Sequence, residues 1–473
     1  MQNLDLGVIG MAVMGRNLAL NLAEHGYKCA VFNRSKGPLE LAKAEDETGL
    51  LQPFEKLEDF VSSLSRPRKI ILMIKSGDPV DSLISQLIPL LSAGDIIADC
   101  GNSYYKDTER RAQELAALDL NYLGVGVSGG EVGARFGPAI MPGGDLAAYE
   151  HFADILKDIS AKAAGEPCSA YIGKGGSGHY VKMVHNGIEY ADMQIIAEGY
   201  YFLRYGLGLS LEEIHDCFEK YNQGPLDSYL IEITAKILTA KDDLASGFLL
   251  DQIVDEARQK GTGRWTNLEA IELAVDCSVL LAGLNGRNIS SMSAERQAAN
   301  KLYGGARKLE LTPKEKQSLI SQVERAILAA KIIAYAQGFA LYHRASEVYD
   351  WQLNLANIAA IFRNGCIIRA KLLKEIMAAF KQEPHCPNLL LSEEFKETVE
   401  ENIKGLRKIV KLAAEIGIAM PAAFAALSYF DSYKSVPSAA NLIQAQRDYF
   451  GAHSFERRDR KGNFHYPWQS LEK

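Results

Sequence analysis

Short apolar runs alternate with amphipathic stretches along the first 176 residues of the chain. The apolar runs have the length of β-strands and lie at Leu4–Ile9, Lys28–Phe32, Ile70–Ile74, Ile96–Ala98, Tyr122–Val127 and Ala170–Ile172. Between them, residues 16–25, 80–91, 107–118 and 145–162 have the apolar spacing of helices. Strands that alternate with helices indicate βαβ units and a parallel sheet. The sequence therefore predicts an α/β Rossmann-type domain over residues 1–177.

From Gly178 to Leu427 the pattern changes to long amphipathic helices without strand alternation. The expected helices are 179–206, 210–220, 225–239, 248–259, 266–276, 314–343, 353–382 and 394–416. We therefore expect an all-helical domain over residues 178–435. A polar and aromatic C-terminal tail, residues 436–473, follows it.

Composition narrows the class of protein. A chain of 473 residues can form two or three domains with sizeable cores. Its formal charge of −7 argues against non-specific binding of nucleic acid. The seven cysteines are dispersed without a Cys-x-x-Cys pair, which favours free thiols and a reducing compartment. Lys331 and Gln337 interrupt the apolar stretch 326–342, so we expect a buried helix and no membrane contact. No basic N-terminal signal region is evident. We expect a cytoplasmic protein.

A glycine motif at the end of the first predicted strand indicates a dinucleotide site. Its residues are Gly10, Met11, Ala12, Val13, Met14 and Gly15. The motif follows a strand and opens a helix, whose N-terminal N–H groups can bind a pyrophosphate. Ala12 replaces the usual middle glycine, so we expect the phosphate to lie slightly further from the backbone.

The second predicted strand ends in Asn33, Arg34 and Ser35. An acidic residue there would bind the ribose 2′-hydroxyl of NAD and repel a 2′-phosphate. An amide, a guanidinium and a hydroxyl can all donate hydrogen bonds to phosphate instead. The sequence therefore predicts NADP as the cofactor.

Three further loops lie at the carboxyl ends of predicted strands, where open α/β sheets bind ligands. They are Ile74-Lys75-Ser76-Gly77, Asp99-Cys100-Gly101-Asn102 and Val127-Ser128-Gly129-Gly130. Each loop alone is equally typical of ordinary turns. Three of them at successive strand ends favour a binding site.

One face of the first long helix carries the candidate chemistry. Lys182, His185, Asn186, Glu189 and Tyr190 fall at i, i+3, i+4, i+7 and i+8, within a sector of roughly 140°. Lys182 and Glu189 lie about 10 Å apart along the helix axis, so their side chains can address opposite ends of a small polar substrate. A solvated helix face with one Lys–Glu pair is the alternative. The nucleotide motifs upstream favour the active-site interpretation. No metal-ligand spacing of His or Cys is apparent.

Several motifs in sequence order carry a resemblance to one family. They are Gly10–Gly15, Asn33–Ser35, Gly126–Glu131, Met141–Gly144, Lys182–Tyr190, Gln259–Gly263, Arg287 and Ala445–His453. Over nearly its whole length, the chain resembles the decarboxylating 6-phosphogluconate dehydrogenases. The resemblance implies NADP-dependent oxidative decarboxylation of 6-phosphogluconate to ribulose 5-phosphate, in the oxidative branch of the pentose phosphate pathway, without a metal. It also implies a homodimer in which the C-terminal tail of one subunit reaches the active site of the other.

The resemblance also implies a role for individual residues. Lys182 would be the general base and Glu189 the general acid. Ser128, Gly129 and Gly130 would bind the substrate near its carboxylate, and Asn102, His185 and Asn186 would bind its hydroxyls. Tyr190, Lys260, Thr262, Arg287, Arg447 and His453 would surround its phosphate. The glycine motif, Asn33–Ser35, Ile74, Lys75, Ser76 and Asn102 would hold NADP.

Six residues at four places depart from the family pattern, namely Cys100, Val132, Asn285-Gly286 and Gly224-Pro225. None of them removes a residue with an expected catalytic role. Two other functions compete with the decarboxylating one. A non-decarboxylating 3-hydroxy acid dehydrogenase would need neither Glu189 nor a distant phosphate site. An inactive NADP-binding sensor or scaffold would have no use for an intact Lys182 and Glu189.

Overall fold

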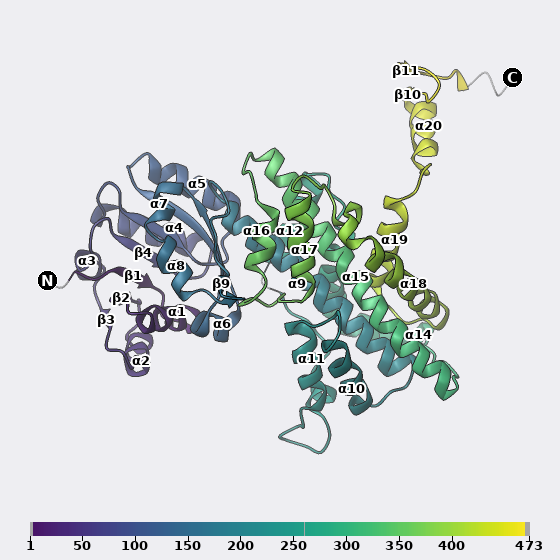
Figure 1. Ribbon diagram of the computed structural model, residues 1–473, viewed down its shortest axis with the longest axis horizontal. Helices are drawn as coiled ribbons and strands as arrows, with labels where there is room; N and C mark the ends of the chain where they lie inside the picture. The colour runs from purple at the N-terminus through teal and green to yellow at the C-terminus, as the bar shows by residue number, and fades with distance from the viewer. Residues whose placement is uncertain (1–2, 260, 469–473) are drawn as a thin grey trace. The chain divides into compact units, whose positions relative to one another are not determined.

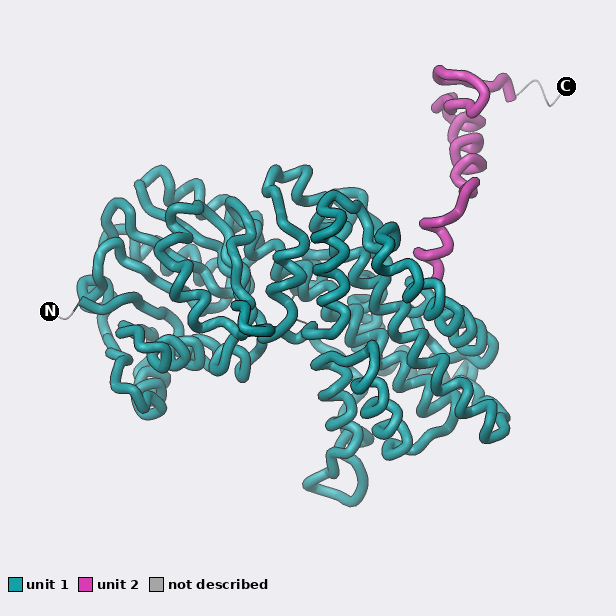
Figure 2. The backbone as a smooth tube through the Cα atoms, viewed as in Figure 1, with its two compact units in different colours: residues 1–426 teal, residues 427–473 magenta. Residues whose placement is uncertain are grey.

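The computed structural model describes residues 3–259 and 261–468. The chain divides into two compact units, residues 1–426 and residues 427–473 (Figure 2). The first unit holds a seven-stranded sheet and most of the helices (Figure 1). In the part of the chain that the structure describes, no helix is long and apolar enough to cross a membrane. All seven cysteines are buried free thiols.

A seven-stranded sheet forms the N-terminal part of the first unit. Its strands are β1 (Leu6–Ile9), β2 (Cys29–Phe32), β3 (Leu51–Phe54), β4 (Lys69–Leu72), β5 (Ile96–Asp99), β6 (Asn121–Ser128) and β7 (Ala139–Gly144). Their order is β3-β2-β1-β4-β5-β6-β7. The first six strands are parallel, and β7 runs antiparallel to β6. This order reverses between β1 and β4, where doubly wound sheets bind dinucleotides. The predicted Rossmann-type fold is confirmed.

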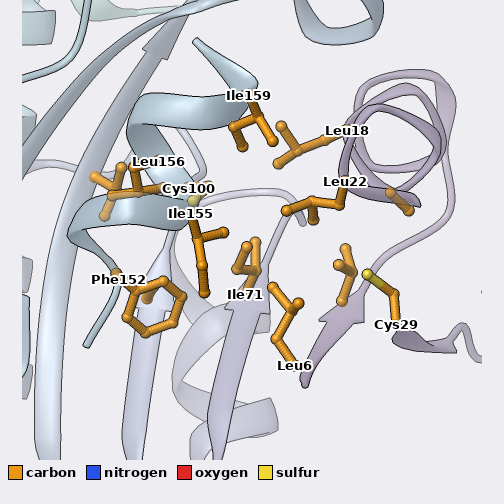
Figure 3. Close-up of a cluster of buried hydrophobic side chains, with 14 of the residues drawn as sticks. Leu6, Leu18, Leu22, Cys29, Ile71, Cys100, Phe152, Ile155, Leu156 and Ile159 are labelled. Carbon is orange, nitrogen blue, oxygen red and sulfur yellow. The ribbon is translucent and has the colours of Figure 1, made fainter. Parts of the chain in front are cut away.

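Helices cover both faces of the sheet. They are α1 (Val13–Glu24), α2 (Lys36–Glu45), α3 (Leu57–Ser62), α4 (Asp78–Leu87), α5 (Tyr105–Ala116), α6 (Gly130–Phe136), α7 (Leu146–Glu150) and α8 (Ala153–Ile159). On one face, Leu18 and Leu22 of α1 and Ile155 and Ile159 of α8 pack over Ile71 of β4 (Figure 3). The other face is covered by apolar residues of α3, α4 and α5. Burial on both sides is what the near-continuous apolar strands predict.

Both edges of the sheet differ from the prediction. The edge strands β3 and β7 were not predicted, because Pro53 and the Pro142-Gly143-Gly144 run are typical of loops. Proline is tolerated in both strands because each lies at an edge of the sheet. The predicted strand at Ala170–Ile172 is wrong. That segment runs beside β7 and pairs with it only through isolated bridges, at Ser169 and Gly173.

Long helices make up the rest of the first unit. They are α9 (Ser177–Tyr201), α10 (Leu211–Asn222), α11 (Tyr229–Thr239), α12 (Thr262–Glu272), α13 (Ser278–Ser290), α14 (Ser293–Tyr303), α15 (Pro313–Val348), α16 (Leu355–Ile361), α17 (Leu372–Gln382) and α18 (Glu393–Ile416). Helix α9 packs against α12, α13 and α15, and also against β6 and β7. It therefore joins the sheet to the helical part, and the predicted all-helical region is confirmed.

Some helix boundaries differ from the predicted ones. The helix predicted at 248–259 is wrong, since only a 3₁₀ turn at Leu249–Gln252 forms there. The helix predicted at 353–382 is two helices, α16 and α17, separated by a turn in which Gly365 has a φ of +67°. Helix α13 was not predicted because glycines interrupt its apolar pattern. One of them, Gly283, is required by close packing: a Cβ there would lie 2.7 Å from the carbonyl oxygen of Tyr190 on α9.

The second unit is a small folded segment. Helix α19 (Pro421–Tyr433) leads into it, and α20 (Ala440–Gly451) is followed by a hairpin of β10 (Phe455–Glu456) and β11 (Asn463–Phe464). The Asp448 carboxylate is fully buried and accepts hydrogen bonds from the backbone N–H groups of Ser454 and Tyr466 and from the indole of Trp468. This carboxylate ties α20 to the residues that follow it.

Candidate active site

The glycine motif forms a tight turn between β1 and α1. Gly10 has a φ of +101°, and a Cβ on Gly15 would lie 1.8 Å from the carbonyl oxygen of Gly10. The turn is held to the end of β2, because the backbone N–H of Met11 donates to Asn33 Oδ1 at 3.0 Å. Ala12 and Val13 are exposed at the start of α1. A helix N-terminus with open backbone in front of it fits a pyrophosphate.

The polar residues at the end of β2 differ in whether they already make hydrogen bonds within the protein. The Asn33 amide also donates to Ser35 Oγ at 2.9 Å, so this side chain is used within the loop. Arg34 is exposed and makes no hydrogen bond or ion pair with any described residue. Lys75 and Asn102 are likewise exposed at the ends of β4 and β5. These groups fit a dinucleotide whose ribose carries a 2′-phosphate.

Lys182 is the centre of a buried polar group on α9. Its side chain is 7% exposed, and Nζ donates to Asn186 Oδ1 at 2.7 Å and to Ser128 Oγ at 3.2 Å. Burial lowers the pKa of the Lys182 ammonium, against the opposing influence of the Glu189 carboxylate. A lysine in this state can act as a base.

A glycine on β6 allows Lys182 to reach Ser128. A Cβ at Gly126 would lie 2.5 Å from the Cβ of Lys182. The absence of a side chain at Gly126 therefore lets α9 approach the strand closely. As a result, the helix face and the loop after β6 meet in one place.

Glu189 completes the same face. Its side chain is 19% exposed, and Oε2 lies 3.7 Å from Nδ1 of His185. Burial raises the pKa of Glu189, while the positive charges of Lys182 and Arg287 act in the opposite direction. Burial and the charge of Lys182 hold the pKa of His185 well below its usual range. We infer that His185 is neutral here and interacts with Glu189 as a polar neighbour.

The predicted phosphate-binding residues are brought partly together. Asn186 Nδ2 donates to Thr262 Oγ1 at 2.9 Å, at the first residue of α12. The guanidinium carbon of Arg287 lies 3.8 Å from the ring centroid of Tyr190. Lys260 lies outside the described residues. Arg447 and His453 belong to the second unit, where Arg447 Nη1 donates to Gln444 Oε1 at 3.0 Å.

The structure adds a segment to the site that the sequence did not single out. The ring of Phe362 meets His185 edge-on, with centroids 5.0 Å apart. A Cβ on Gly129 would lie 2.6 Å from the carbonyl oxygen of Gly365, so the turn between α16 and α17 abuts the loop after β6. A glycine inside a predicted helix was the only local signal for this turn, and its partners are distant in sequence.

The departures from the family pattern are accommodated. Cys100 is buried in the apolar core on one face of the sheet (Figure 3). Val132 is exposed on α6. Gly286 packs against the side chain of Gln194, and Gly224-Pro225 lies in the turn between α10 and α11. In the described parts of the chain, no cluster of three or more His, Cys, Asp or Glu side chains is arranged to hold a metal ion.

Comparison with known proteins identifies the family of the chain. Residues 5–173 match the family described as the NAD binding domain of 6-phosphogluconate dehydrogenase, and residues 178–468 match the 6-phosphogluconate dehydrogenase C-terminal domain. The chain is 49% identical, over 99% of its length and 100% of the relative's, to the NADP(+)-dependent decarboxylating 6-phosphogluconate dehydrogenase of Bacillus subtilis. It is 50% identical to the NAD(+)-dependent decarboxylating enzyme of the same organism, over 98% of this chain and 99% of the relative.

A solved structure is similar over nearly the whole molecule. It is the 6-phosphogluconate dehydrogenase of Plasmodium falciparum, studied with its cofactor NADP+ and with its substrate 6-phosphogluconate. The TM-score is 0.95 at 43% identity, covering 98% of this chain and 100% of that one. The chain therefore belongs to the 6-phosphogluconate dehydrogenase family.

Proposed function

We propose that this protein oxidises and decarboxylates 6-phosphogluconate to ribulose 5-phosphate and CO₂ with reduction of NADP+. The observation that carries the proposal is the buried Lys182 amine, held by Asn186 and Ser128 within the same polar face as Glu189. The names of the relatives support the reaction.

The first step requires a base. Lys182, whose pKa is lowered by burial, takes the proton of the substrate's C3 hydroxyl. NADP+ held at the glycine motif would supply the acceptor for the hydride that leaves C3. The hydrogen bonds from Nζ to Asn186 and Ser128 fix the amine's position before the substrate arrives. Such preorganisation lowers the cost of reaching the reactive geometry.

The second step breaks the C1–C2 bond of the resulting β-keto acid. Lys182, now protonated, donates a hydrogen bond to the C3 oxygen while CO₂ leaves, and the bonding electrons form an enediolate whose charge this hydrogen bond stabilises. Glu189, whose pKa is raised by burial, supplies the proton that C2 then needs. Protein side chains alone therefore account for both proton transfers, and the proposal includes no metal.

The remaining site residues would bind the two ends of the substrate. Ser128, Gly129 and Gly130 contact its carboxylate, and Asn102, His185 and Asn186 contact its hydroxyls. Tyr190, Lys260, Thr262 and Arg287 would surround its phosphate, together with Arg447 and His453 of the neighbouring subunit. Binding energy from the phosphate orients the reacting end.

The cofactor assignment rests on Arg34. Relatives at 49% and 50% identity carry the names of NADP(+)-dependent and NAD(+)-dependent enzymes, so overall similarity does not decide between the cofactors. The free guanidinium of Arg34 favours NADP+ because it can pair with a 2′-phosphate. The glycine motif, Asn33, Ser35, Ile74, Lys75, Ser76 and Asn102 would complete the cofactor site.

One assay tests the reaction. NADPH absorbance and CO₂ release are followed with 6-phosphogluconate, with and without a chelator. We expect one CO₂ for each NADPH and no effect of the chelator. NADPH without CO₂ would indicate a non-decarboxylating 3-hydroxy acid dehydrogenase. Neither product, with tight NADP+ binding, would indicate the inactive sensor.

We further propose a homodimer in which Arg447 and His453 act in the neighbouring subunit's site. Both belong to the separate second unit, and Tyr449 and Phe450 beside them are exposed apolar side chains that a partner could cover. Lys182→Met and His453→Ala subunits are each expected to be inactive. Mixed dimers should regain activity, because one of their two sites combines the intact Lys182 of one chain with the intact His453 of the other. Absence of recovery on mixing contradicts the shared site.

A further inference from the structure

The loop that carries Asn102 is connected to α12 by a partly buried network. The residues after Asn102 begin α5, which covers the sheet, whereas α12 belongs to the helical part and begins at Thr262. Asn102 and Thr262 are both residues of the proposed site. The contacts between these two segments therefore bear on the geometry of that site.

A hydrogen-bonded chain forms the core of the network. Glu269 on α12 is 1% exposed and accepts a hydrogen bond from the Tyr349 hydroxyl. The hydroxyls of Tyr349 and Tyr105 lie 3.0 Å apart. A tyrosine hydroxyl has a single hydrogen to donate, so Tyr105 is the donor to Tyr349. Lys106 adds a positive charge, with Nζ 3.9 Å from the Glu269 carboxylate.

Aromatic packing surrounds these hydrogen bonds. The rings of Tyr105, Tyr180, Tyr349 and Trp351 all contact one another, with centroid distances of 4.7 to 6.2 Å. In addition, Tyr104 contacts Trp265 of α12 at 5.0 Å. Three consecutive residues, Tyr104, Tyr105 and Lys106, thus link the end of the Asn102 loop to α12, directly or through Tyr349.

The network continues to the catalytic face of α9. Thr262, at the start of α12, accepts a hydrogen bond from Asn186, which in turn accepts one from Lys182. Asn102 lies at one end of this path and Lys182 at the other. Since Asn102 is assigned to both cofactor and substrate, its distance from Lys182 affects the geometry of hydride transfer.

We propose that Glu269 and Tyr349 are positioning residues that set the placement of the Asn102 loop relative to Lys182. Neither side chain is assigned to substrate or cofactor. The inference rests on the proposed function, because hydride transfer from 6-phosphogluconate is its readout. A misplacement of about 1 Å can cost on the order of a hundredfold in rate.

Tyr349→Phe tests the inference, because it removes the hydroxyl and keeps the ring in the aromatic cluster. We expect kcat/KM for 6-phosphogluconate to fall on the order of tenfold to a hundredfold. The deuterium isotope effect with substrate labelled at C3 should rise, because hydride transfer becomes more rate-limiting. Glu269→Gln keeps an oxygen that accepts from Tyr349, so it should retain more activity than Glu269→Ala.

Tyr221→Phe is the matched control. Its hydroxyl donates to the Ile320 carbonyl at 2.8 Å in a buried position of α10, outside the proposed site. We expect it to change the melting temperature without changing the isotope effect. The inference is overturned if Tyr349→Phe behaves like Tyr221→Phe in an enzyme whose wild type forms NADPH and CO₂. A wild type that forms neither overturns the proposed function itself.

Discussion

Replacing Arg34 with alanine should change the cofactor preference without disturbing the fold. Arg34 is exposed and has no hydrogen-bond or ion-pair partner among the described residues, so its removal breaks no such interaction there. Surface changes of this kind usually alter stability by less than about 0.5 kcal/mol. The lost interaction is a hydrogen bond to a charged group, which is worth about 1.5–3 kcal/mol. Because the site is open to solvent, we expect the lower part of that range, about 1.5–2 kcal/mol.

This free energy corresponds to a rise of roughly 10- to 30-fold in the Michaelis constant for NADP+. The Michaelis constant for NAD+ should stay nearly unchanged, since NAD+ has no 2′-phosphate. Lys43→Ala is the control: it removes an equal charge from the last turn of α2, which follows Arg34 in the chain. Initial rates with both cofactors measure the effect. Equal changes for NADP+ and NAD+ would show that Arg34 does not bind the 2′-phosphate.

Two further predictions concern the pH dependence and the stability of the helical part. Lys182 must be neutral to act as a base, so kcat/KM should fall as the pH drops below the lowered pKa of Lys182. Glu189 must be protonated to act as an acid, so the rate should fall as the pH rises above the raised pKa of Glu189. Profiles of rate against pH check both limbs. The residual activity of Glu189→Gln should no longer fall at alkaline pH. A Glu189→Gln profile that still falls at alkaline pH argues against Glu189 as the general acid. Lys331→Met leaves the Asp192 carboxylate, 2.9 Å away, buried without its ion pair, and should destabilise the protein by about 3–5 kcal/mol in urea unfolding. Lys174 forms an exposed ion pair, so Lys174→Met should lower the free energy of unfolding by less than about 1 kcal/mol. Equal losses of stability in the two variants would be inconsistent with this reasoning.

The features that the sequence predicted well depend on local pattern. The β1–α1 turn follows from its glycines, and the face of α9 follows from the helical spacing of Lys182, Asn186 and Glu189. Both the turn and the helix face form as predicted, because residues close together in the sequence determine them.

The features that the sequence did not predict depend on contacts between distant segments. Strand β7 forms despite Pro142 because it lies at an edge of the sheet. The turn around Gly365 divides a predicted helix, and its carbonyl contacts Gly129 from more than 200 positions away. The link from Tyr105 through Tyr349 to Glu269 likewise joins three separate segments. No periodicity within one segment carries that information.

The rate and binding properties of Lys182→Met decide whether Lys182 is the general base. The substitution removes the amine and keeps an unbranched apolar stem on α9, so binding of NADP+ and 6-phosphogluconate, measured by calorimetry, should change little. Loss of an acid–base group costs about 10²- to 10⁴-fold, and we therefore expect kcat to fall by at least about a hundredfold. Retention of more than about a tenth of the wild-type rate would contradict the assignment of Lys182 as the base.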